Sequence, residues 1–279
     1  MKNKIIRIIP KLDIKNGNLI KGINLEGLRV LGNPIHFAEN YYNQGADEIM
    51  YLDNVATLYG TNNLTKFVKN TAKKIFIPLT VGGGIKNLKE IEQMLKSGAD
   101  KISINSAAID NLDLIKEASK VFGSSTIVSN LECVKINNKY LISKSNGRDL
   151  VNKDPYDWSR KLEDAGLGEI FLTSVNSEGL QKGFDITLTK KVAKAVNIPV
   201  IASGGAGNFN HVLEVINQTN VEGVSISSLF HYDIFSNFKF KKQKIANFHF
   251  LENSKKKKSI QSLKKLKIFL KKKGINVRY

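Results

Sequence analysis

The sequence predicts a (β/α)8, or TIM, barrel, in which eight parallel strands alternate with helices around a closed ring. Two observations predict this fold. Short apolar segments alternate with amphipathic segments along the chain of 279 residues. In addition, the chain repeats itself, because residues 77–87 (IPLTVGGGIKN) resemble residues 198–208 (IPVIASGGAGN) at an offset of 121. We therefore expect a single domain, 1–279, built from two half-barrel repeats of four strands each.

Each strand is predicted from a short apolar run that ends in a polar or glycine-rich turn. The first run, 5–14, is broken by Lys15-Asn16-Gly17-Asn18, and a loop carrying Lys21 and Gly22 is expected to follow. The fifth strand is expected to continue into a hairpin around Asn137-Asn138. The second to eighth strands are predicted over 48–53, 75–81, 101–104, 126–132, 169–174, 198–202 and 223–227.

Each helix is predicted from apolar residues at helical spacing, often followed by a glycine that ends the helix. A lysine-rich insertion with several aromatic residues, at about 235–258, precedes the last helix and is expected to be a surface excursion. The helices are predicted over 34–43, 64–74, 88–97, 154–165, 185–196, 209–217 and 259–273.

The net charge of +18 is concentrated near the C-terminus. Residues 239–279 hold 15 Lys and Arg against Glu252 alone, a net of +14, so the other 238 residues contribute only +4. A terminal lysine-rich segment is usually a solvated surface, and we expect neither a nucleic-acid nor a membrane partner. Because no run of eighteen apolar residues and no signal-peptide core occurs, a cytoplasmic protein is expected.

Cysteine and histidine are too sparse for a metal site. Cys133 is the only cysteine, which excludes an internal disulfide. The histidines are scattered without the spacing of metal ligands, so we predict no metal and no cofactor; they are His36, His211, His231 and His249.

Two carboxylates are placed for chemistry. Working residues of such barrels lie at the C-terminal ends of strands, where Asp13 ends the first strand and Glu132 the fifth. Capping a loop or helix is the ordinary role of a carboxylate at such a position. Because the half-barrel repeat makes these two positions equivalent, we interpret Asp13 and Glu132 as a general acid/base pair.

The repeated glycine turns predict two phosphate sites. A strand that runs into a glycine turn and then a helix aims backbone N–H groups at an anion. We assign Gly84, Asn105 and Ser106 to one phosphate; Asp53, at the end of the second strand, is added as a substrate-binding residue. The second site is assigned to Glu178, Gly179, Gly204, Gly205, Ser227 and Ser228. The expected substrate is therefore phosphorylated at both ends.

These segments resemble the cyclase subunit of imidazole glycerol phosphate synthase, and the resemblance covers nearly the whole chain. It includes Ile8 to Ile14, Leu19 to Gly22, Val81 to Ile85, Ser103 to Ala108, Ala202 to Gly207, Phe230-His231 and Gly274 to Arg278. It implies an enzyme of histidine biosynthesis that uses ammonia from a glutaminase subunit. The implied reaction converts a bis-phosphorylated ribulosyl aminoimidazole carboxamide ribotide to imidazole glycerol phosphate and aminoimidazole carboxamide ribotide.

The resemblance also assigns roles. Asp13 matches the general base of the family, and Lys21 matches a lysine on a mobile loop. The glutaminase is expected to form a heterodimer with this chain at the N-terminal face of the barrel. A ring of charges gates ammonia entry at that face, and its four members match Arg7, Glu48, Lys101 and Glu169. Charged residues at strand starts can also be simple rim salt bridges.

Several positions depart from the family pattern. Glu132 and Glu178 each replace an aspartate. By strand alternation, Lys11 shares the inward face with Asp13, where the family has a small residue. A buried lysine needs a partner, and Asp13 or Glu132 is the expected one. Such a pair would alter the acid/base roles that the resemblance implies.

Three functions follow from these features. The first is the cyclase and lyase itself. The second is a paralogue that delivers ammonia to another synthetase, for example in the amidination of a surface sugar, which would account for changed lumen residues beside an intact charge gate. The third is a nucleic-acid or membrane-surface binder that acts through the lysine-rich segment, which would show binding that weakens steeply with salt.

Overall fold

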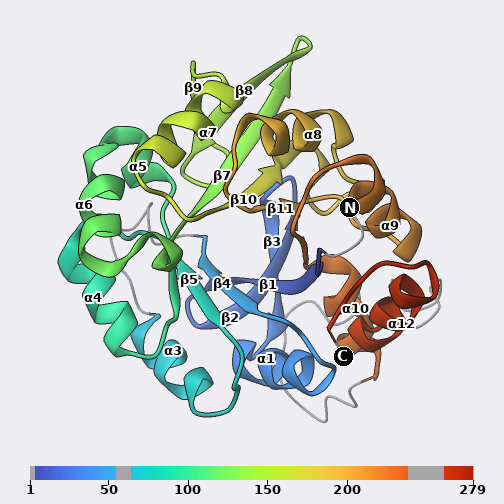
Figure 1. Ribbon diagram of the computed structural model, residues 1–279. Helices are drawn as coiled ribbons and strands as arrows, with labels where there is room; N and C mark the ends of the chain where they lie inside the picture. Colours follow the sequence, from blue (N-terminus) through green and yellow to red (C-terminus); the bar gives the residue numbers. More distant parts are fainter. Residues whose placement is uncertain (1–3, 55–63, 238–260, 279) are drawn as a thin grey trace.

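The computed structural model describes residues 4–54, 64–237 and 261–278 (Figure 1). Within these residues, eight parallel strands close into a barrel, which confirms the predicted fold. The order around the ring is β1 (Arg7–Lys15), β4 (Ile49–Asp53), β5 (Leu79–Gly82), β6 (Lys101–Ser103), β7 (Ile127–Ile136), β10 (Glu169–Ser174), β11 (Val200–Ser203) and β12 (Gly223–Ile226), and β12 pairs again with β1.

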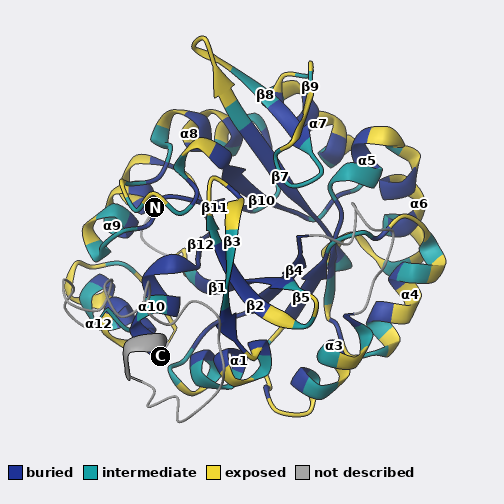
Figure 2. Ribbon diagram, turned by 180° about the vertical axis from the view of Figure 1, so that it is seen from behind, coloured by how far each residue is buried: buried dark blue, intermediate teal, exposed yellow. Residues whose placement is uncertain are grey.

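Helices surround the ring and bury their apolar stripes against it. Figure 2 shows buried residues on the strands and exposed residues on the outer faces of the helices. Short 3-10 turns occur at η1 (Ser124–Thr126) and η2 (Val175–Ser177). The helices are α1 (Pro34–Asn43), α3 (Thr65–Ala72), α4 (Leu88–Lys96), α5 (Ser106–Asp110), α6 (Asp113–Phe122), α7 (Pro155–Asp164), α8 (Ile186–Ala195), α9 (Phe209–Gln218), α10 (Ser228–Asn237) and α12 (Leu263–Lys272).

The sequence repeat is also a structural repeat. Each copy of the repeat ends in an asparagine that caps the next helix. Asn87 caps α4 by accepting a hydrogen bond from the Glu90 N–H, and Asn208 caps α9 by accepting one from the His211 N–H. The paired glycines take positive φ values in both copies, 108° at Gly83 and 91° at Gly204, followed by 70° and 111° at their neighbours. A side chain is strained in this conformation, so both turns require glycine.

The segment after the first turn is a ribbon rather than the expected loop. Antiparallel strands β2 (Asn18–Ile23) and β3 (Glu26–Gly32) place Lys21 and Gly22 on β2. The ribbon crosses the middle of the ring (Figure 1). Its tip meets the loop after β10, where the Asn24 N–H donates to the Glu178 carbonyl at 2.8 Å. The ribbon therefore covers the C-terminal mouth of the barrel.

A second ribbon rises from β7. The hairpin predicted around Asn137-Asn138 is present, and it joins β7 to β8 (Lys139–Lys144) with both turn residues at positive φ. A third strand, β9 (Asp149–Val151), pairs with β8 and was not predicted. The turn between β8 and β9 returns to the mouth, because the Gly147 N–H donates to Glu132.

Other boundaries differ from the sequence prediction. The segment predicted as a strand from residue 75 pairs with its neighbours only from Leu79 to Gly82. Helices α5, α6 and α10 were not predicted. In α6, the buried residues Leu114, Ile115 and Ala118 have helical spacing, so the missed signal was present in the sequence.

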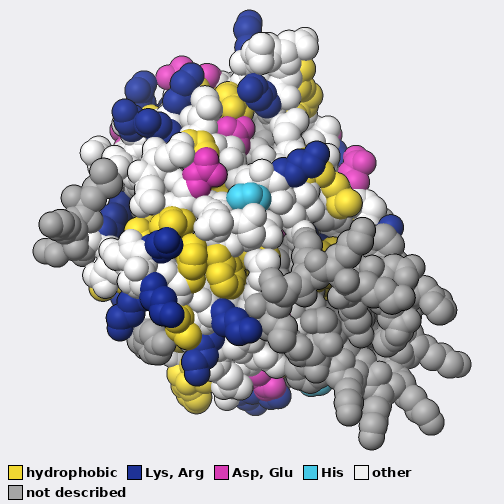
Figure 3. All heavy atoms as spheres, turned by 90° about the vertical axis from the view of Figure 1, so that its right-hand side faces the viewer, with side chains coloured by type: hydrophobic (Ala, Val, Ile, Leu, Met, Phe, Trp, Pro, Cys, Tyr) yellow, Lys and Arg dark blue, Asp and Glu magenta, His cyan; other side chains and the backbone are white. Residues whose placement is uncertain are grey.

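The last helix packs back on the start of the barrel. Lys267 of α12 forms a buried ion pair with Asp47 at 2.8 Å, and Asp47 also accepts a hydrogen bond from the Ile8 N–H. Figure 3 views this side of the molecule and shows lysine and arginine side chains on it. The predicted insertion at about 235–258 falls almost wholly on 238–260, outside the described residues, while 235–237 belong to α10.

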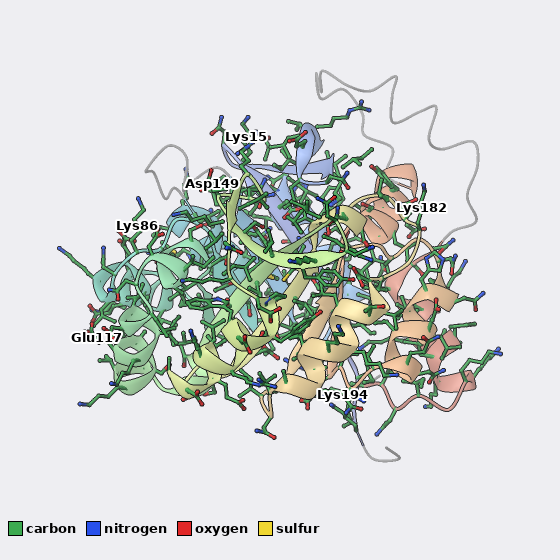
Figure 4. All side chains as sticks on the ribbon, turned by 90° about the horizontal axis from the view of Figure 1, so that it is seen from above. Lys15, Lys86, Glu117, Asp149, Lys182 and Lys194 are labelled. Carbon is green, nitrogen blue, oxygen red and sulfur yellow. The ribbon has the colours of Figure 1, made fainter. Side chains whose placement is uncertain are left out.

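The barrel has two distinct ends and an apolar lumen between them. Figure 4 shows Lys15, Asp149 and Lys182 toward the end where the strands finish, and Lys194 toward the opposite end. The interior between the ends is filled by a separate apolar cluster of Ile9, Met50, Leu52, Val128, Phe171 and Ile201. The buried charged side chains at the two ends are therefore separated by an apolar layer.

Candidate functional site

Four buried charged side chains meet at the C-terminal mouth. The Lys11 ammonium lies 3.8 Å from Asp13 Oδ1 and 3.9 Å from Glu178 Oε2. The Lys21 ammonium lies 3.7 Å from Asp13 Oδ2 and forms a close ion pair with Glu178. All four side chains are at most 4% exposed. Two cations thus balance two anions in a space that water scarcely reaches.

The charges of this cluster control one another. Burial alone would lower the pKa of Lys11, but Asp13, Glu178 and Glu132 outweigh it and raise that pKa. Burial alone would raise the pKa of Glu178, but Lys11 and Lys21 outweigh it and lower that pKa to about 2. Both groups are therefore charged at neutral pH. The sequence analysis expected Lys11 to pair with Asp13 or Glu132; the pair with Asp13 is present, and Glu178 is a further partner.

Glu132 lies on β7, opposite β1 in the ring, so the two predicted carboxylates do come from opposite sides of the mouth. Its carboxylate accepts hydrogen bonds from Asn130 Nδ2 at 3.2 Å and from the Gly147 N–H at 3.0 Å. Burial raises the pKa of Glu132 to about 7, against the opposing effects of Lys11 and Gly147. A carboxyl with this pKa can give or take a proton near neutral pH.

His231 of α10 is buried, and Lys21, Glu178 and Lys11 act on it through their charges. Its Nδ1 is 2.5 Å from the Tyr41 hydroxyl, and its Nε2 has no hydrogen-bond partner among the described residues. Burial, together with the positive charge of Lys21, lowers the pKa of His231 to about 3. This histidine is therefore neutral at physiological pH and serves as a packing and hydrogen-bonding group.

The first predicted phosphate site lines a cavity of about 200 Å³. Asn105 Nδ2 donates to the Ser143 carbonyl, while Asn105 Oδ1 and the Ser103 hydroxyl have no partner within the described part of the chain. Such unpaired buried atoms are available to a ligand. The cavity reaches Glu132 and is lined by Asp53, Gly83, Gly84, Ile85, Lys86, Ser103, Asn105, Ser106, Asn130 and Asn146, among others.

The second site is smaller, with a cavity of about 10 Å³. A Cβ built on Gly204 would come within 3.2 Å of the Glu178 carboxylate, so that carboxylate lies against the glycine turn. The Ser225 hydroxyl has no partner among the described residues, which matches the state of Ser103 in the first site. All the residues assigned to this site meet here: Glu178, Gly179, Gly204, Gly205, Ser227 and Ser228.

Four charged residues form a closed ring at the N-terminal face. The Glu48 carboxylate accepts from Arg7 at 3.1 Å and from Lys101 at 2.9 Å. Glu169 pairs with Lys101 at 2.8 Å and closely with Arg7. The carboxylates are almost fully buried, whereas about a fifth of each cationic side chain is exposed. We call these four residues the charge ring; the structure brings all of them together.

Sequence reasoning missed some residues of the mouth. Asn130 could have been found, because it lies two positions before Glu132 on the same face of β7, and its amide oxygen accepts from Thr173. The Gly147 N–H carried no such signal, since it approaches Glu132 only when the β8–β9 turn folds back.

The sequence matches the family described as "Histidine biosynthesis protein" over residues 7–236. The imidazole glycerol phosphate synthase subunit HisF of Legionella pneumophila is 52% identical over 205 residues, which cover 73% of this chain and 97% of that protein. The subunit HisF of Bacillus cereus strain G9842 is 44% identical over 227 residues, which cover 81% and 90%. The chain belongs to the HisF family.

The matched range begins at Arg7 of the charge ring and ends within α10. The lysine-rich insertion from residue 237 onward and α12 lie beyond the matched range. Within the described residues, no helix has the length and apolarity needed to cross a membrane. Nor do those residues contain a cluster of three or more side chains suited to a metal ion.

Proposed function

We propose that this chain is the cyclase subunit of imidazole glycerol phosphate synthase. With ammonia, it converts a bis-phosphorylated ribulosyl aminoimidazole carboxamide ribotide to imidazole glycerol phosphate and aminoimidazole carboxamide ribotide. The observation that carries the proposal is the mouth itself, where Asp13 and Glu132 come from opposite sides of the ring and two cavities are lined by the paired glycine turns. The 44% and 52% identity to HisF subunits supports the same reading.

The two carboxylates divide the acid/base work. Asp13 lies between two ammonium groups and acts as the base that removes a proton from the incoming nitrogen. Glu132, whose pKa is about 7, is protonated in a useful fraction at neutral pH and supplies a proton to the departing group. The phosphates, held at both ends of the substrate, fix the reacting carbons between these two groups.

Ammonia reaches the mouth through the lumen. A glutaminase subunit docks at the N-terminal face, where the charge ring surrounds the entrance. The apolar cluster above the ring has no hydrogen-bonding group to retain a small polar molecule, so ammonia passes to the first polar residues at the other end. The partner face, the route and the substrate are parts of this proposal.

The decisive experiment supplies the purified chain with the bis-phosphorylated substrate and an ammonium salt, without a partner. Turnover is expected, and Asp13→Asn is expected to reduce it by about 10²- to 10⁴-fold, the range for a lost general base. Asp164→Asn makes the same change on the exposed end of α7 and should leave turnover unchanged.

Two results would overturn the proposal. One is the absence of wild-type turnover despite tight binding of the substrate, which would leave a chain that only passes ammonia onward. The other is full activity in Asp13→Asn. Thermal melts of both variants check that each remains folded.

A further inference from the structure

The Lys11 ammonium is the most unusual group in the mouth. It is 1% exposed, and neither of its ion pairs, at 3.8 and 3.9 Å, is short enough to be a hydrogen bond. Its three N–H donors therefore have no acceptor among the described residues. Buried donors without acceptors are costly, which suggests that an atom of a ligand completes this site.

The position of Lys11 narrows down which part of a ligand it meets. Strand alternation on β1 places Arg7, Ile9, Lys11 and Asp13 on the inward face. Ile9 belongs to the apolar lumen, so Lys11 is the first polar group on this strand above that lumen. Lys11 is also within reach of both predicted phosphate sites: it pairs at 3.9 Å with Glu178 of the second cavity, and its charge acts on Glu132 of the first.

We propose that Lys11 is a substrate-contacting residue whose ammonium donates to the ketone oxygen of the ribulosyl group. This assignment rests on the proposed function. Ammonia that leaves the lumen along β1 enters the layer that holds Lys11, so a carbon that it attacks there lies beside this ammonium. A ligand whose two phosphates occupy the two sites would place its middle at the same point.

The step that Lys11 assists is the addition of ammonia. The nitrogen lone pair forms the C–N bond, and the π pair of the ketone moves to its oxygen. The Lys11 ammonium stabilises the negative charge that develops there, in the manner of an oxyanion hole. The extra proton on the new nitrogen passes to the Asp13 carboxylate, 3.8 Å from Lys11.

A purely structural role for Lys11 must be separated from this one. Lys11 and Lys21 balance Asp13 and Glu178, so Lys11→Met alone leaves two buried anions with one nearby cation and should lower the melting temperature. Adding Glu178→Gln restores the balance to one cation and one anion. The pair of changes therefore separates charge balance from substrate contact.

The test is a double-mutant cycle with Lys11→Met, Glu178→Gln and the combined variant, measured at saturating ammonium salt. Lys11→Met should lower kcat by about 100-fold, as expected for a lost oxyanion donor. The kcat of the combined variant should likewise be about 100-fold below that of Glu178→Gln. Its melting temperature, however, should be higher than that of Lys11→Met. Lys194→Met, at the opposite end of the barrel (Figure 4), is the matched control and should retain kcat.

A loss that shrinks below about threefold in the Glu178→Gln background would overturn the proposal, because Lys11 would then act only as a counter-ion. Calorimetric titration with the substrate, without ammonium, is the second measurement. If the wild type binds the substrate but does not turn it over, the proposed function fails. The affinities of the variants for the substrate then decide whether Lys11 contacts it. Binding about tenfold weaker in both backgrounds supports the contact, and equal affinity excludes it. A wild type that neither binds nor reacts overturns both proposals.

Discussion

The Glu132 side chain is controlled by groups from three parts of the chain. Asn130 precedes it on β7, Gly147 reaches it from the β8–β9 turn, and Lys11 acts on it from β1. Burial outweighs the stabilisation that Lys11 and Gly147 give to the charged form, so the pKa rises to about 7. The site thus contains one carboxyl that titrates in the physiological range.

The raised pKa of Glu132 predicts a pH-dependent stability. Because the folded pKa is above the unfolded one, the contribution of the protonated carboxyl is complete below about pH 4.5 and is lost as pH rises through about 7. Glu132→Gln removes this titration. The unfolding free energy of the variant minus that of the wild type should therefore rise by roughly 3 kcal/mol as the pH is raised from about 4.5 to 8. Urea denaturation at each pH measures this difference.

The control for this experiment is Glu117→Gln, which makes the same substitution at an exposed position of α6 (Figure 4). Its stability difference from the wild type should stay constant over the same pH range. A constant difference for Glu132→Gln as well would show that Glu132 titrates alike in the folded and unfolded states.

The residues of the site were predictable only in part. The repeat and the strand ends placed Asp13 and Glu132 at opposite sides of the mouth, because those positions follow from topology. The strand period placed Lys11 inward for the same reason. The raised pKa of Glu132 could not be predicted, since it depends on how completely the mouth is covered.

At the scale of elements, the ribbon and the two glycine turns set the shape of the mouth. The turns were found because glycine at positive φ has a sequence signature, whereas the ribbon was taken for a loop. Its tip residues Asn24 and Leu25 have φ values of 48° and 66°, and a leucine in that region is uncommon, so no standard turn pattern marked the hairpin. The ribbon is held by tertiary contacts such as Asn146 Nδ2 to the Leu25 carbonyl.

The two predicted phosphate sites differ in what lies against the glycine turn. The second contains the Glu178 carboxylate, and the lowered pKa of about 2 keeps it ionised at neutral pH. An anion beside an anion is disfavoured unless Lys21 turns from the carboxylate toward the phosphate. The first cavity is also lined by carboxylate residues, among them Asp53 and Glu132, but a Cβ on Gly83 would meet the backbone and Cβ atoms of Asp53 rather than a carboxylate oxygen.

This asymmetry predicts unequal phosphate binding. In a titration with inorganic phosphate followed by amide NMR signals, the Gly84 amide should respond at a lower concentration than the Gly205 amide. Glu178→Gln should lower the concentration needed at Gly205 by about tenfold, because it removes a buried like charge.

Glu117→Gln again serves as the control, and neither signal should shift its midpoint. Equal midpoints for Gly84 and Gly205 in the wild type would contradict the argument. So would a Gly205 midpoint that does not respond to Glu178→Gln.

At the scale of the whole molecule, two charged layers are separated by an apolar one. The charge ring lies at the N-terminal end. The buried charged cluster of Lys11, Asp13, Lys21 and Glu178 lies at the C-terminal end. Between them lies the apolar cluster that includes Met50 and Phe171. A neutral ammonia molecule can cross such a layer at far lower cost than an ammonium ion, since a bare charge in a dry interior is strongly disfavoured.

The charge ring should therefore matter only when ammonia comes from the partner. Glu169→Gln removes one carboxylate and leaves Arg7 and Lys101 to share Glu48, so the cations repel each other and the ring opens. Turnover with glutamine and the glutaminase subunit should fall about tenfold, the effect of one lost charged contact. Turnover with ammonium salt, where ammonia does not come from the partner, should stay near the wild-type rate. The measured quantity is the ratio of the two rates.

Glu222→Gln is the matched control, because the Glu222 carboxylate pairs with Lys4 at 2.9 Å and acts on Arg7 only through its charge, without an ion pair in the ring. Its rate ratio should equal that of the wild type. If Glu169→Gln lowers both rates equally, the ring supports the fold of the barrel and does not control ammonia entry. If neither rate changes, the entrance lies elsewhere, and the glutaminase need not dock at the face where Arg7 and Lys101 are partly exposed.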